Sequence, residues 1–256
     1  MRRLAPLAAL ALLAGCAGGP GGPLGGGRGR GGPPLPPAAQ PTSVIATELA
    51  FARAAREEGQ AAAYRRFAAT GAQVQADGAA VGVESWLAGS TNASTADRWV
   101  PRQAWASCDG SAVVVAGIGS DSAGNWSRFT RVWERQQGGQ FRWIYTHSAP
   151  DAELTRARQE SAQQRAEDEA RGDAILVEAG NFIRAKVADC SNRPAAPSAG
   201  DTPAAGAGEG MGISRDRTLR WSWQPSAGQA GSFVAYSWNG TGWDEVHMEP
   251  GPSAAG

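Results

Sequence analysis

The hydrophobic pattern of this chain changes its period near residue 99, and that change limits the folds the chain can adopt. Before it, apolar residues recur at helical spacing; after it, apolar and polar residues alternate, as is typical of strands. Helices followed by antiparallel strands predict an α+β domain, which we place over residues 43–150. With 256 residues, 42% of them hydrophobic, the chain can bury one sizeable core.

The helical part is predicted as two helices and one shorter helical stretch. Ser43 is a candidate N-cap, and Gly59 separates the first helix from a second one that ends at Gly71. Residues 84–87 form the short stretch. We expect the apolar face of the first helix to comprise Ile45, Leu49, Phe51, Ala52 and Ala55.

Four strands follow, each bounded by turn residues. The pair Asp109-Gly110 precedes the second strand, and Gly138-Gly139 joins the last two strands as a hairpin. The predicted strands cover residues 99–105, 112–117, 126–136 and 140–147.

Three stretches in this region carry a family resemblance. They are Cys108-Asp109-Gly110-Ser111 before a strand, Phe129-Thr130-Arg131-Val132-Trp133-Glu134-Arg135, and its hairpin partner Phe141-Arg142-Trp143-Ile144. With the order of elements, they resemble the nuclear transport factor 2-like superfamily, especially its SnoaL-like branch. The resemblance implies a cone-like domain, in which N-terminal helices pack on a curved antiparallel sheet and a pocket lies between them.

Aromatic residues are abundant where the resemblance implies a pocket, and the chain has ten tryptophans. Such a lining favours a small apolar ligand, although the same rings can simply fill the core. The candidate lining residues are Tyr64, Trp86, Trp105, Trp133, Tyr145 and His147.

Catalysis in the resembling branch uses a carboxylate base inside the pocket. Here Asp109 lies in a turn and Glu134 is flanked by bulky residues, so no acid–base pair emerges and we assign no catalytic residue. His147 is the best single polar candidate. His147 and His247 lack the spacing of metal ligands, and no phosphate-binding or dinucleotide motif is present, so we expect neither metal nor cofactor.

The C-terminal part is predicted as a charged helix followed by a tryptophan-rich β unit. The helix covers residues 151–172, begins at the cap Asp151 and is mostly solvated. The β unit covers residues 173–248, with a disordered loop at 194–210, and its strands either stand alone or extend the first sheet. Residues 249–256 are predicted as a disordered tail.

Two cysteines, Cys108 and Cys190, are candidates for a disulfide that joins the two β regions. In an oxidising compartment the bond would close a long loop and stabilise the fold. The alternative is two free thiols too far apart to bridge.

The N-terminus has the layout of an export signal. A basic start and an apolar run too short to cross a bilayer lead to Leu13-Ala14-Gly15-Cys16. These four residues resemble the bacterial lipobox, which implies that residues 1–16 are a lipoprotein signal and that Cys16 is acylated. The following glycine and proline residues, 17–41, predict a disordered tether. Ala17, and not aspartate, after the cysteine resembles the outer-membrane sorting pattern of enterobacterial lipoproteins, which implies the periplasmic face of the outer membrane.

These features lead to three functional hypotheses. The first is a non-catalytic envelope lipoprotein, held at the membrane by its lipid anchor, that binds a small apolar ligand. The second is a small isomerase, cyclase or hydrolase of the SnoaL-like type, and the third is a module that binds an envelope protein. The formal net charge of zero argues against nucleic acid as a partner.

Overall fold

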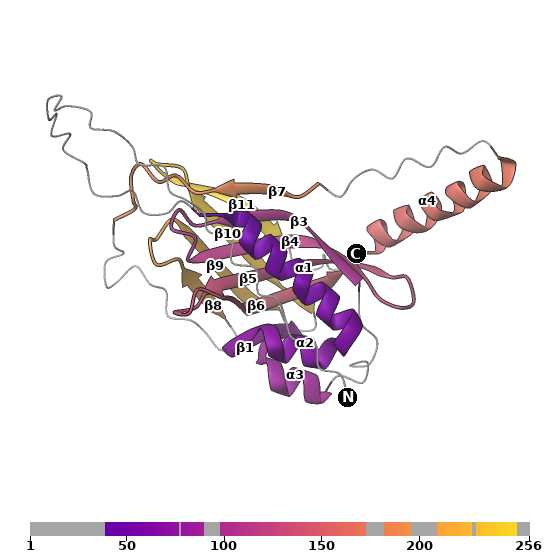
Figure 1. The fold of residues 1–256 in the computed structure, drawn as a ribbon, viewed down its shortest axis with the longest axis horizontal. Helices are drawn as coiled ribbons and strands as arrows, with labels where there is room; N and C mark the ends of the chain where they lie inside the picture. Colours follow the sequence, from indigo (N-terminus) through magenta and orange to yellow (C-terminus); the bar gives the residue numbers. More distant parts are fainter. Residues whose placement is uncertain are drawn as a thin grey trace, which may run out of the picture. The chain divides into compact units, whose positions relative to one another are not determined.

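Three layers make up the part of the chain that the computed structural model describes (Figure 1). A helical layer covers one face of a seven-stranded sheet, and a four-stranded sheet covers the other face. The α+β class is therefore confirmed. The described residues are 39–76, 78–89, 98–172, 182–195, 209–226 and 229–249, so the predicted signal, Cys16 and nearly all of the tether lie outside them.

The helical layer begins earlier than the sequence suggested. Gln40, not Ser43, occupies the N-cap position, and Pro41, which we had placed in the tether, is the first helical residue. Proline is favoured there because its missing N–H would have no partner in the first turn. The Ser43 hydroxyl instead donates to the Gln40 carbonyl oxygen at 2.8 Å. The layer consists of α1 (Pro41–Glu58), α2 (Gln60–Phe67) and α3 (Val83–Gly89).

The seven-stranded sheet is mixed, which corrects the expected antiparallel sheet. Its order is β2-β1-β6-β5-β4-β3-β7, and both β1 with β6 and β3 with β7 pair in parallel. The four predicted strands are confirmed as β3 to β6, which pair antiparallel. The strands are β1 (Ala68–Ala76), β2 (Ala79–Gly82), β3 (Arg98–Ala106), β4 (Ala112–Ser120), β5 (Trp126–Arg135), β6 (Phe141–Pro150) and β7 (Arg184–Val187).

The strands β1 and β2 occupy a segment that the sequence analysis assigned in part to a helix. The second helix stops at Phe67, and Gly71, the expected helix end, lies inside β1 with a φ of 76°. This segment is rich in alanine and glycine, which have weak strand propensity. Its strand conformation therefore depends on pairing with β6, a contact that local sequence does not reveal.

The charged helix forms as predicted and is α4 (Ala152–Arg171). The Asp151 carboxylate accepts a hydrogen bond from the Leu154 backbone N–H at 2.7 Å, and Gly172 ends the helix in the left-handed conformation. None of its residues is buried. Within the described ranges, no helix is long and apolar enough to cross a membrane.

The second sheet has the order β11-β10-β9-β8 and is antiparallel throughout. Because β7 belongs to the first sheet, the predicted 173–248 unit is divided between the two sheets. Gly210 and Glu249, which we had placed in disordered segments, lie in β8 and β11; most of the predicted loop lies outside the described residues. The strands are β8 (Gly210–Ile213), β9 (Leu219–Ser226), β10 (Gln229–Trp238) and β11 (Trp243–Glu249).

A disulfide links the segments after the neighbouring strands β3 and β7, and hydrogen bonds connect the same end of the first sheet to the turn before β9. Cys108 and Cys190 are bonded, with their Cα atoms 5.4 Å apart, which confirms the predicted pairing. The Cys108 backbone N–H donates to the Thr218 hydroxyl at 2.8 Å, and the Asp109 N–H donates to the Asp216 carboxylate at 2.7 Å. Cys108, Asp216 and Thr218 are buried, whereas Cys190 lies at the surface.

Tryptophans of β9 fill the space between the two sheets. Trp223 stacks on Tyr145 of β6, with ring centroids 4.4 Å apart. The neighbouring strand β8 has a glycine beside each indole. A Cβ added at Gly212 would lie 2.3 Å from the Trp221 ring, and one added at Gly210 would lie 1.9 Å from the Trp223 ring. The glycines of β8 thus leave the room that the indoles need.

Both histidines of the chain lie between the sheets, where His147 is buried and His247 is mostly buried. His147 of β6 is 1% exposed, and the His247 ring Nε2 lies 2.6 Å from the Thr130 hydroxyl. Burial lowers the pKa of each imidazole to about 4, and for His247 the nearby His147 adds to this effect. Burial raises the pKa of Glu249, which lies 3.6 Å from His247.

We expect these histidines to make the fold less stable in mild acid. Because their folded-state pKa lies below the usual value of about 6.5, the unfolded chain takes up protons first. Their contribution to the free energy of unfolding is fully present above about pH 6.5 and is lost as the pH falls towards 4. The loss is up to roughly 3 kcal/mol for each histidine. Urea unfolding at about pH 7 and about pH 5.5 measures this loss.

The variant His147→Leu/His247→Gln provides the control, because the chain has no other histidine. Glu249, with its raised pKa, shifts stability in the opposite direction and remains in both proteins. The variant should therefore lose less stability than the parent between the two pH values. An equal loss in both proteins would show that the histidines do not cause it.

Candidate functional site

A small cavity lies between the helical layer and the seven-stranded sheet. Its volume is about 240 Å³, smaller than the pockets that hold drug-sized ligands. Residues from α2, α3 and five strands reach it. They are Gln60, Tyr64, Val74, Gln75, Trp86, Trp99, Gly119, Ser127, Phe129, Arg131, Thr146 and Ser148.

These side chains share one face because side-chain directions repeat every two residues in a strand and about every 3.6 residues in a helix. In β5, alternate residues Ser127, Phe129 and Arg131 point to the helical side. In α2, Gln60 and Tyr64 are four residues apart and so share a helix face. The Tyr64 ring lies 4.9 Å from the ring of Trp86 in α3, which closes the cavity on the helical side.

A buried carboxylate supports the wall of this cavity. Glu48 of α1 is fully buried and accepts hydrogen bonds from the indole N–H groups of Trp99 and Trp133, at 2.7 and 2.8 Å. It also accepts a hydrogen bond from the Arg131 guanidinium, with which it forms an ion pair. Three donors therefore stabilise one charged group inside the core.

Arg131 connects this buried ion pair to the cavity. Its guanidinium lies over the ring of Phe51 at 4.6 Å, Phe129 at 5.1 Å and Trp99 at 5.4 Å, distances that suit cation–π contacts. Its Nε has no hydrogen-bond acceptor among the residues that the structure describes. A buried arginine that lines a cavity, and whose Nε has no acceptor, can still donate a hydrogen bond to a ligand oxygen.

Sequence reasoning missed Glu48. The expected apolar face of α1 ran through Leu49, which is 46% exposed, so that part of the prediction was wrong. The buried face instead includes Val44, Glu48, Phe51 and Ala55, which follow helical spacing. A carboxylate inside an apolar stripe was the signal that could have revealed this residue.

The structure divides the predicted pocket residues among three places. Tyr64 and Trp86 line the cavity. Trp133 belongs to the core beneath α1, where it donates to Glu48. The other three candidates lie on the opposite face of the sheet, against or near the second sheet; these are Trp105, Tyr145 and His147.

A β-bulge explains why two nearby aromatic residues of β6 face opposite sides. Val132 pairs with Tyr145, whereas the next residue, Trp133, pairs with Trp143, so Ile144 has no partner in the register. An extra residue of this kind reverses the alternation of side chains beyond it. Trp143 therefore faces the helices and Tyr145 faces the second sheet.

The cavity lining contains neither a carboxylate nor an imidazole among the described residues. Within the same part of the chain, no group of three or more histidine, cysteine, aspartate or glutamate residues could hold a metal ion. The lining can form hydrogen bonds to a ligand through the side chains of Arg131, Gln60, Ser127 and Ser148. Aromatic rings provide the apolar part of the lining. This arrangement suits recognition of a small molecule.

No protein-family model matches the chain, and no curated protein matches it in sequence.

We expect Glu48→Leu to reduce the free energy of unfolding by about 3–5 kcal/mol, because it leaves a buried arginine unpaired and removes the acceptor of two indoles. The exposed Glu57 of the same helix provides a matched control, and Glu57→Leu should change stability by about 0.5 kcal/mol or less. Chemical denaturation measures both. Similar losses in the two variants would mean that the Glu48 contacts contribute little.

Proposed function

We propose that this protein is a lipid-anchored envelope protein whose α+β domain, of the SnoaL-like type, binds a small uncharged molecule with a ring and a carbonyl or hydroxyl oxygen. Arg131 carries the proposal, because it lies buried at a cavity wall with an unused donor. The helical layer on one face of the sheet, with a cavity between them, supports the SnoaL-like assignment.

The charge of the site favours an uncharged ligand. The Arg131 cation is paired with the Glu48 anion, so a ligand carboxylate would add an uncompensated charge in a largely dry place. A carbonyl oxygen can accept a hydrogen bond from Arg131 without that cost. The rings of Tyr64 and Trp86 provide an apolar surface for the rest of the molecule. The sequence predicted a small apolar ligand, and the proposed ligand differs from it by one hydrogen-bond acceptor.

Binding fits this geometry better than acid–base catalysis does. A catalytic base must reach the substrate, and neither of the two groups best suited to that role does so. The Glu48 carboxylate is occupied by three donors behind the lining, and His147 lies on the other face of the sheet.

We expect benzamide to bind to the cavity more tightly than toluene, which lacks an acceptor, or benzoate, which carries a charge. Ser127→Phe should fill the cavity and weaken benzamide binding about tenfold or more, since the ring would occupy the ligand's place. Ligand-observed NMR titration measures these affinities.

The matched control is Ser122→Phe, which adds the same ring at an exposed turn residue that does not line the cavity. It should leave benzamide binding unchanged. Binding of benzamide that is equal in both variants, or undetectable in the parent, would contradict the proposed site.

The lipid anchor is supported by the sequence around Cys16. We expect Cys16→Ser to move the protein from the membrane fraction to the soluble fraction of the producing bacterium, because it removes the acylated thiol. Incorporation of labelled palmitate into the parent, and not into the variant, would confirm the anchor. Equal membrane association of the two proteins without labelling would refute it.

A further inference from the structure

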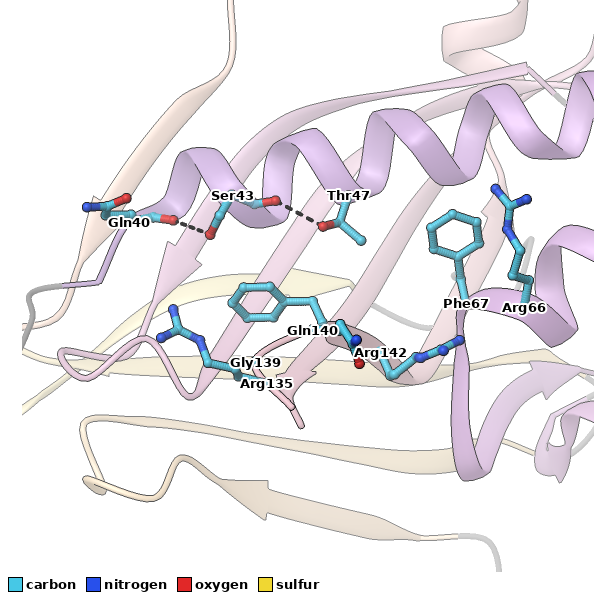
Figure 2. A pocket seen from close by; sticks show the side chains of 10 residues that line it. Gln40, Ser43, Thr47, Arg66, Phe67, Arg135, Gly139, Gln140 and Arg142 are labelled. Atoms are coloured by element: carbon cyan, nitrogen blue, oxygen red, sulfur yellow. Dashed lines mark hydrogen bonds between the residues drawn. The ribbon is translucent and has the colours of Figure 1, made fainter. Parts of the chain in front are cut away.

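A second, larger hollow lies between α1 and the tip of the β5–β6 hairpin (Figure 2). Its volume is about 710 Å³. Figure 2 shows Ser43 and Thr47 on α1 above it and Arg135 and Arg142 on the hairpin below, with Phe67 at one end. We call it the arginine groove. Its lining residues are Gln40, Ser43, Thr47, Arg66, Phe67, Arg135, Gly139, Gln140, Phe141 and Arg142.

The arginine groove carries positive charge that its own lining does not neutralise. Three of its residues are arginines, and the described lining includes no aspartate or glutamate. Arg66 is paired with Glu58 at 2.5 Å, but Arg135 and Arg142 have no carboxylate partner among the described residues. The Arg135 Nε is buried without an acceptor, while its guanidinium lies 5.1 Å from the Phe141 ring centroid.

The contact with Phe141 holds the Arg135 guanidinium at the groove. A guanidinium fixed in this way loses less conformational freedom when it binds a ligand than a free side chain does. The first turn of α1 adds to the positive potential, because it has no side-chain cap and no acidic residue. The hydroxyls of Ser43 and Thr47 already donate to backbone carbonyls, so the arginines remain the principal donors.

We propose that the arginine groove binds a phosphate ester. The planar fork of a guanidinium matches two phosphate oxygens, and Arg135 and Arg142 each provide one such fork, at opposite ends of the hollow (Figure 2). The hollow is too large for a free phosphate ion alone, which favours an ester with a carbon substituent beside Phe67. The ester belongs either to a soluble metabolite or to a phospholipid headgroup.

The experiment compares these two sources in titrations of the full chain held in a neutral detergent. One arm adds glycerol 3-phosphate, and the other adds mixed micelles that contain phosphatidylglycerol, with diacylglycerol micelles as the phosphate-free reference. We expect Arg135→Gln/Arg142→Gln to weaken the binding of the phosphate compound about tenfold or more. Binding in only one arm would identify the source.

The matched control is Arg156→Gln/Arg165→Gln, which removes the same charge from exposed positions of α4. Arg142→Gln alone keeps the Arg135 contact with Phe141 and should show an intermediate loss, so the result does not depend on the fold of the double variant. Equal binding by the groove and control variants, or no binding in either arm, would overturn the proposal. Benzamide binding and Cys16 acylation test different residues, so failure here is distinguishable from failure of the proposed function.

Discussion

The contact on which the site depends is the buried group around Glu48. One carboxylate of α1 accepts hydrogen bonds from side chains of β3 and β5, namely Trp99, Arg131 and Trp133. Taking a charge out of water costs several kcal/mol, and such a group persists only when nearly all of its hydrogen bonds are made. The position of α1 on the sheet therefore depends on this group together with the apolar contacts of Val44 and Phe51, and Glu48 fixes the position of Arg131 at the cavity.

The bulge in β6 has a comparable effect on the sheet itself. It allows Trp143 to contribute to the core under the helices while Tyr145, two residues later, stacks on Trp223 of the second sheet. The same reversal directs Thr146 and Ser148 to the cavity and turns His147 away from it. One extra residue thus places polar side chains of β6 at the cavity on one face and the buried His147 on the other.

Much of the fold could be predicted because it depends on local pattern. Alternation of residues and glycine turns predicted β3 to β6, and the Asp151 cap and Gly172 predicted α4. The strand β1, and the parallel pairings of β1 with β6 and of β3 with β7, could not be predicted, because each pairing joins segments that are distant in sequence. The Cys108–Cys190 bond could be predicted because only two cysteines follow Cys16 in the chain.

The candidate site was less predictable for the same physical reason. Tyr64, Trp86 and Tyr145 were named as aromatic residues of the module, and His147 as the polar residue at a strand end. Only the first two line the cavity, because the bulge in β6 turns Tyr145 and His147 to the other face. Glu48 was missed because a carboxylate is normally assigned to a solvated helix face. A buried charge becomes reasonable only when its partners are known, and the partners of Glu48 lie 51 to 85 residues further along the chain.

In our two proposals, the hollows of this domain select their ligands by different physical means. At the inner cavity, Glu48 cancels the charge of Arg131, so the remaining selectivity comes from hydrogen-bond direction and ring contacts. At the arginine groove the cancelling carboxylates are absent from the described lining, so charge itself selects the ligand. Because the whole chain has a formal net charge of zero and salt screens charges beyond about 10 Å, this attraction acts only near the groove. An anion is therefore recognised by the local arrangement of guanidinium groups and not by the field of the protein as a whole.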